Sequence, residues 1–92
     1  MAIDPGLLDD STEGVRDAAT RAIQALLYDL SQPGADVVSI SARIAIANIA
    51  LVAAAVSIGT CTMDGTDMHY SGRGDGLYVC CSAAHQHCWK VN

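Results

Sequence analysis

The sequence predicts a single α+β domain, in which two antiparallel apolar helices precede a small three-stranded antiparallel β meander and a Cys/His-rich C-terminal tail. Three observations support this fold class. Residues 11–31 and 36–58 carry apolar side chains at three- and four-residue steps, which is the period of a helix. Residues 60–82 contain short runs separated by glycine turns, as a meander requires. The chain has 92 residues, which is enough for one hydrophobic core and therefore one domain, residues 1–92.

The first helix follows an arm formed by residues 1–10, whose Pro-Gly pair interrupts regular structure. Asp10 and Glu13 resemble a capping box with Asp as the cap, and their charges suit a helix N-terminus. A second Pro-Gly pair ends the helix at residue 31, because proline cannot continue the hydrogen-bond ladder. The apolar face of this helix comprises Val15, Ala18, Ala19, Ala22, Ile23, Leu26, Leu27 and Leu30.

The second helix, residues 36–58, is expected to start at Asp36 as N-cap and to be apolar on two opposite sides. One apolar seam comprises Val37, Ile40, Ile44, Ala47, Leu51, Ala54 and Ile58. The other comprises Val38, Ala42, Ala45, Ile49, Val52 and Val56. The β-branched residues also fit a strand, but the many alanines favour a helix. A helix that is apolar all round must be buried, so we expect the β segment, other subunits or lipid to cover it.

One amphipathic partner helix cannot cover both seams in a monomer, so the sequence predicts a homo-oligomer. The predicted interface comprises Ile40, Ile44, Asn48, Leu51, Val52 and Ile58. A membrane span is not favoured, because the apolar stretch from Ile44 to Gly59 is only about 24 Å long as a helix. A bilayer core requires about 20 apolar residues, which exceeds this stretch.

The net charge of −5 is concentrated in the first 36 residues, and no basic stripe follows. Without such cations to neutralise phosphates, nucleic-acid binding is not expected. The N-terminus has neither a positive region nor an apolar region of signal-peptide type. We therefore expect a cytoplasmic or virion-associated location rather than secretion through a signal peptide. Small acidic single-domain chains are frequent among phage and mobile-element proteins, which makes a viral structural or inhibitory protein a reasonable hypothesis.

The period of two along a strand predicts which side chains share a face of the meander. Met68 and Tyr70 fall on one face, where they can meet Leu77, Val79 and Cys81. The opposite face receives His69, Tyr78 and Cys80. The tail, residues 83–92, could form a short helix that carries Trp89.

Four cysteines in so short a chain suggest disulfides that stabilise a small core. The strand pattern predicts a bridge between Cys61 and Cys81 and another between Cys80 and Cys88. The alternative is a structural zinc ion, with Cys61, Cys81, His85 and Cys88 as ligands of the types that zinc prefers. The spacing departs from the paired cysteine knuckles of common zinc modules. The main interpretation therefore includes no cofactor.

No arrangement of residues indicates catalysis, so we expect a protein that is not an enzyme. Arg73-Gly74-Asp75 matches an integrin-binding tripeptide, but a hairpin turn also requires glycine and aspartate. The leading hypothesis is a small self-assembling or binding protein that acts through an oligomeric helix interface. A second hypothesis is a Cys/His module stabilised by metal and used for partner binding. A third is a secreted modified-peptide precursor with residues 1–59 as leader.

Overall fold

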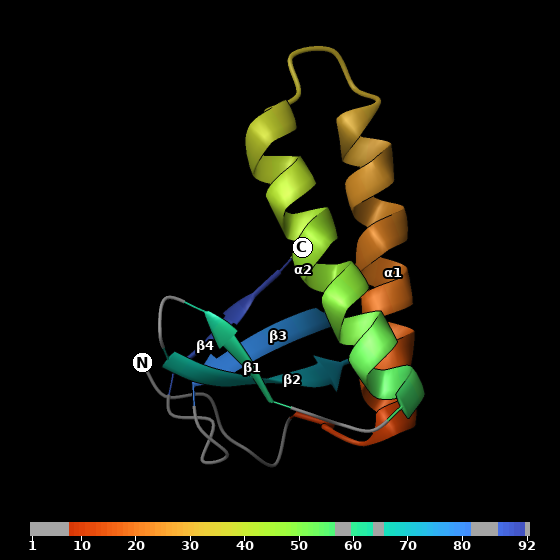
Figure 1. Ribbon diagram of the computed structural model, residues 1–92. Helices are drawn as coiled ribbons and strands as arrows, with labels where there is room; N and C mark the ends of the chain where they lie inside the picture. Colours follow the sequence, from red (N-terminus) through yellow and green to blue (C-terminus); the bar gives the residue numbers. More distant parts are fainter. Residues whose placement is uncertain (1–7, 57–59, 64–65, 82–86, 92) are drawn as a thin grey trace.

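The computed structural model in Figure 1 describes residues 8–56, 60–63, 66–81 and 87–91, with backbone alone for residues 56, 60–63 and 66. It confirms the α+β class: two helices are followed by an antiparallel sheet. The elements are α1 (Thr12–Leu30), α2 (Val37–Val56), β1 (Thr60–Met63), β2 (Thr66–Arg73), β3 (Gly76–Cys81) and β4 (His87–Lys90). The strands lie in the order β1-β2-β3-β4, and each pairs antiparallel with its neighbours in the chain.

The meander has a fourth strand where the sequence predicted only a tail that could be helical. Residues His87–Lys90 pair with β3, so that Trp89 lies opposite Val79 and Cys88 lies opposite Cys80. The Val91 N–H donates to the Leu77 carbonyl and extends this pairing by one bond. The suggestion of a helix around Trp89 was therefore wrong, because cross-strand pairing and a cysteine bridge hold this short segment in extended form.

The N-cap of α1 lies one residue later than predicted. Ser11, not Asp10, is the N-cap, and its side-chain oxygen accepts a hydrogen bond from the Gly14 N–H at 3.1 Å. Asp9 supports this cap because its carboxylate accepts from the Ser11 N–H. Hydrogen bonding to the Ser11 side chain and to its backbone N–H lowers the pKa of Asp9. The serine satisfies one of the N–H groups that a helix start leaves open.

The two helices form an antiparallel hairpin, seen side by side in Figure 1. The connecting turn contains Gly34 at φ 76°, a left-handed conformation that glycine adopts readily. Asp36 then caps α2 as predicted: its carboxylate accepts from the Ser39 N–H at 3.1 Å. Both ends of α1 and the start of α2 therefore differ from the predicted bounds by one residue, and the predicted end of α2 at residue 58 lies outside the described residues.

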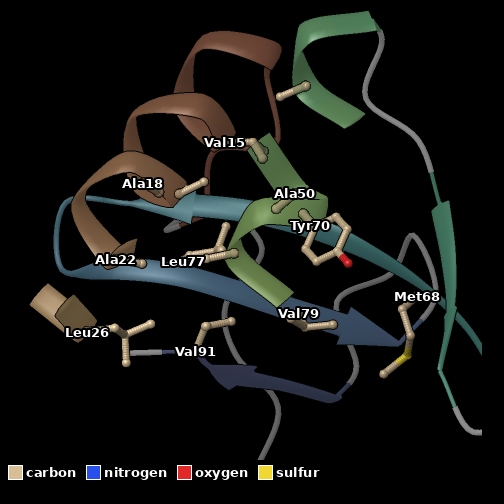
Figure 2. Packing of buried hydrophobic residues seen from close by; sticks show 13 residues of the cluster. Val15, Ala18, Ala22, Leu26, Ala50, Met68, Tyr70, Leu77, Val79 and Val91 are labelled. Carbon is tan, nitrogen blue, oxygen red and sulfur yellow. The ribbon is translucent and has the colours of Figure 1, made fainter. Parts of the chain in front are cut away.

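The main core lies where α1 packs on α2 on one side and on β2 and β3 on the other. Alanines of both helices and larger side chains of the sheet point into this core (Figure 2). The fully or almost fully buried members are Val15, Ala18, Ala19, Ala22, Leu26, Ala47, Ala50, Ala54, Met68, Tyr70, Leu77, Val79 and Val91. Small side chains let the two helix backbones approach closely. Because α1 contacts both α2 and the sheet, it forms the middle layer.

The other face of the sheet carries a smaller buried cluster, which contains Leu8, Tyr78 and Cys80 with Cys88 packed against it. His69 and Ser71 are also buried, and the register places them opposite Cys80 and Tyr78. The predicted division of the strands into two faces is thus confirmed. Leu8 belongs to the arm, so the arm's described end contributes to the fold.

Helix α1 approaches β2 most closely at two glycines. A Cβ atom on Gly72 would overlap the carbonyl oxygen of Gly14. The backbone of Asp9 also pairs with Gly72, with both N–H···O distances at 2.6 Å. Gly72 therefore joins three segments, because the strand, the start of α1 and the arm all meet at its backbone.

Candidate functional site

Helix α2 leaves an apolar face uncovered by the described residues, which we call its outer face and define by Val38, Ala42, Ala45, Ile49 and Val52. All five are exposed. The larger side chains are exposed to 82% at Val38, 52% at Ile49 and 66% at Val52. These residues recur at steps of four and three, so they form one continuous stripe along the helix. The stripe is the second of the two seams seen in the sequence.

This exposure follows from the way the hairpin is assembled. The alanines Ala47, Ala50 and Ala54 turn inward toward the core, so the opposite side of α2 is left uncovered by the residues that the structure describes. The β segment packs on α1 and not on the outer face of α2 (Figure 1). Among the described residues of one chain, the predicted burial of this side of the helix is therefore not found.

The predicted interface residues divide between the two sides of α2. Ile40, Ile44 and Leu51 are partly buried and pack against the core, whereas Asn48 and Val52 are exposed. Ile58 lies outside the described residues. Ile49, absent from the predicted interface, is instead an exposed member of the outer face. The heptad-like spacing from Val38 to Val52 was the signal that could have identified it.

A shallow apolar hollow lies at the C-terminal end of the outer face and is lined by Asn48, Ile49, Val52 and Ala53. It is open to solvent, and the Asn48 amide is the one polar side chain among these lining residues. Such a depression accepts a protruding aliphatic side chain rather than a polar small molecule.

Helix α2 is also long and apolar enough to cross a membrane by length and composition. The apolar stretch is Val37–Ala55. Its most apolar part has a mean hydropathy of 2.0, and 17% of that part is buried. This extends the stretch considered from the sequence toward the N-terminus, so the argument that the helix is too short was wrong. Core helices of soluble proteins have a similar length and composition, so these two properties alone do not indicate a membrane span.

The cysteines are only partly arranged as predicted. Cys80 and Cys88 form a disulfide, as predicted, and the structure places them directly opposite each other in β3 and β4. Cys81 instead carries a free thiol. The predicted bridge from Cys81 to Cys61 is therefore absent, because β2 lies between β1 and β3. Two strand spacings place their Cα atoms roughly 9–10 Å apart, which is beyond the reach of a disulfide.

Two of the four predicted zinc ligands, Cys81 and Cys88, are kept apart in this arrangement. Cys88 is held in the disulfide and so supplies no thiolate, and Cys81 lies on the opposite face of the sheet from it. His85 lies outside the described residues. Within the part of the chain that the structure describes, no three His, Cys, Asp or Glu side chains gather around a common point.

The Arg-Gly-Asp tripeptide forms the closed turn between β2 and β3. The Arg73 guanidinium binds the Asp75 carboxylate through two nitrogens, at 2.6 and 2.5 Å. Tyr78 donates its hydroxyl proton to the same carboxylate at 3.1 Å, and its ring lies beneath the Arg73 guanidinium. The Arg and Asp side chains are thus bound to each other, which does not suit a motif that must present both to a receptor.

Electrostatics in this turn follow from those contacts. The hydrogen bonds from Arg73 hold the pKa of Asp75 well below its usual range, and burial opposes them weakly. Partial burial raises the pKa of Tyr78, because the phenolate would lose solvation and would face the Asp75 carboxylate. Arg21 of α1 donates to the Arg73 carbonyl at 3.1 Å and ties the turn to the helix. The Arg73 and Asp75 side chains therefore stabilise the turn and its contact with α1.

Comparison with protein-family models, with curated proteins and with solved structures found no match.

Proposed function

We propose that the protein is a non-enzymatic, self-assembling protein in which the outer face of α2 packs against the same face of a second copy. The observation that carries this proposal is the exposure of Val38, Ile49 and Val52 along one stripe. Fully burying an aliphatic side chain of this size contributes roughly 1.5–3 kcal/mol. Association that buries these three side chains would therefore lower the free energy of the protein.

The pattern of side chains on this face supports a second copy as the occupant. Ala42 and Ala45 lie between the larger Val38 and Ile49, so another helix can approach closely at the alanines. The stripe has a heptad-like spacing, which suits helix-to-helix packing. A symmetric pair needs only this one self-complementary surface, because both copies contribute the same residues.

The distribution of negative charge on the protein also favours pairing through this face. The acidic residues lie mainly on α1 and the arm, and none belongs to the outer face of α2. Two copies that meet through this face keep their negative charges apart, which reduces the repulsion expected from a net charge of −5.

Lipid is the competing occupant, and the hairpin argues against it. Insertion of α2 would either separate it from α1 or carry α1 into the membrane as well. Separation would expose the buried alanine contact between the helices. Carrying α1 inward would bury Arg16, Asp17 and Arg21 in the bilayer, at several kcal/mol each.

Sedimentation velocity over a range of protein concentrations tests the proposal. The wild-type chain is expected to associate reversibly, whereas Ile49→Glu and Val52→Glu are expected to sediment as folded monomers. Gln24→Glu is the matched control, because it adds the same charge to an exposed position of α1. It should associate as the wild type does.

Two results would contradict self-assembly. One is a wild-type protein that stays monomeric at every concentration. The other is flotation with phosphatidylcholine vesicles that the Ile49→Glu substitution abolishes without changing the oligomeric state, since this would identify lipid as the partner of the face.

A further inference from the structure

Three residues with soft or borderline metal-binding side chains occupy one row across β2, β3 and β4. The register places Met68 opposite Cys81, and Cys81 opposite His87. Residues directly opposite in antiparallel strands project from the same face. The row therefore crosses these three strands on the face that also carries Tyr70 and Val79.

Two sulfur atoms already meet in the middle of this row. The Cys81 thiol donates to the Met68 thioether at a sulfur-to-sulfur distance of 3.4 Å. Met68 is almost completely buried, whereas Cys81 is partly exposed. The pair thus lies at the margin of the core, where an ion can enter from one side and be shielded on the other.

We propose that Met68, Cys81 and His87 form a binding site for Cu(I). Binding replaces the thiol proton: Cys81 releases H⁺ and its thiolate bonds to the ion, while Met68 and neutral His87 each donate a lone pair. No group changes oxidation state. Thiolate and thioether sulfur are soft ligands that select Cu(I), and the Met68 thioether distinguishes this site from the zinc site considered from the sequence.

Charge also favours a monovalent ion at this position. One thiolate neutralises one Cu(I), so the complex at the edge of the core carries no net charge. The same ligands around Zn(II) would leave a positive charge beside buried apolar side chains, which is costly. Two sulfurs at about 2.3 Å from one ion stand about 3.8 Å apart in a tetrahedral arrangement. A small movement of the flexible Met68 side chain provides this separation.

His87 completes the site. It lies directly opposite Cys81 on the neighbouring strand, and an imidazole is long enough to reach across the sheet. His87 is exposed and lies on the edge strand, so its ring can turn toward Cys81 without disturbing the core.

Anaerobic titration of the full chain with Cu(I), in competition with a chromophoric Cu(I) chelator, tests this site. The expected result is one bound equivalent and a Cu(I)–thiolate absorption band. Cys81→Ser should remove binding. Met68→Leu and His87→Ala should each weaken it at least tenfold, the order of loss seen when groups that support a metal are removed. Met63→Leu is the matched control and should bind as the wild type does.

The outcomes separate the site from simpler explanations. Unchanged affinity in both Met68→Leu and His87→Ala would show binding by a thiol alone and overturn the proposal. A second disulfide, detected by intact mass under nonreducing conditions, would consume Cys81 and also overturn it. Circular dichroism checks that Met68→Leu is folded; if it is not, His87→Ala decides, because its position is exposed. The Ile49→Glu variant should bind Cu(I) normally, so this site is independent of self-assembly.

Discussion

Gly72 connects the three parts of the fold at the scale of a single residue. The start of α1 lies so close to β2 there that an added methyl group would overlap the Gly14 carbonyl, and the arm pairs with the same backbone. Neither neighbour is the flexible end of a side chain, so the backbone itself would have to move.

We expect Gly72→Ala to lower the free energy of unfolding by roughly 1–3 kcal/mol, the usual cost of overpacking. Gly74→Ala is the control, because a Cβ at Gly74 meets no atom within 4 Å and should change stability by less than about 0.5 kcal/mol. Urea denaturation of both variants measures the difference. Equal stability of the two variants would mean that α1 and β2 are not in close contact at Gly72.

The Arg73–Asp75 pair makes stability depend on acid. Because the pKa of Asp75 is lowered in the folded chain, the unfolded chain takes up a proton at this carboxyl first as the pH falls. The stabilisation is therefore fully present above the ordinary carboxyl pKa of about 3.9 and is lost as the pH drops through the lowered value.

Asp75→Asn is accordingly expected to flatten the loss of stability below about pH 4. Thermal melts at a series of pH values, with Asp29→Asn as a control for an exposed aspartate, measure this effect. An acid profile that Asp75→Asn leaves unchanged would show that the ion pair does not persist in solution.

At the scale of the element, the start of α2 depends on Asp36. Removing its carboxylate should cost about 1 kcal/mol, because the Ser39 N–H loses its acceptor at a helix N-terminus. Asp29→Ala makes the same change in the last turn of α1, where a negative charge opposes the helix dipole. It should be neutral or slightly stabilising. Chemical denaturation distinguishes the two, and a similar loss in both would contradict capping by Asp36.

Much of the secondary structure could be predicted because its signals are local. Helical periodicity and the Pro33-Gly34 breaker defined both helices, and the alternation along Met68–Cys81 separated the two faces of the strands. The cap of α1 was misplaced by one residue, because Asp10 and Ser11 both have suitable side chains. Only the backbone geometry selects between them.

The remaining features depend on contacts distant in the sequence. Strand β4 is short, and its extended form is fixed by pairing with β3 and by the bridge to Cys80. Likewise, both seams of α2 are apolar, so composition could not reveal which one faces α1. The inward side is the one where Ala47, Ala50 and Ala54 meet the alanines of α1, and this choice placed Ile49 and Val52 outside.

At the scale of the whole molecule, α1 is the central layer and α2 an outer one. The buried residues of α1, from Val15 to Leu26, are at most 1% exposed, and both neighbouring layers cover them. The helix hairpin also extends beyond the sheet toward its turn (Figure 1). Stability should therefore be unevenly distributed between the helices.

Hydrogen exchange is expected to be slowest in α1 when the protein is dilute. If the chain self-assembles through the outer face, exchange in α2 should slow as the concentration rises, while α1 changes little. Mass spectrometry of peptides from the two helices at low and high concentration measures both effects. Greater protection of α2 than of α1 in dilute protein would contradict this layering.

The neighbouring residues Cys80 and Cys81 place an oxidised and a reduced sulfur on opposite sides of one strand. A thiolate exchanges with a disulfide by direct attack on one of its sulfur atoms, and the sheet itself blocks that approach here. Although Cys80 and Cys81 are adjacent in the chain, the Cys81 thiol cannot reach the disulfide. The Cys80–Cys88 bond can therefore exchange with Cys81 only after β3 and β4 separate. The rate at which the Cys80–Cys88 disulfide exchanges with the Cys81 thiol would thus report how often β3 and β4 separate.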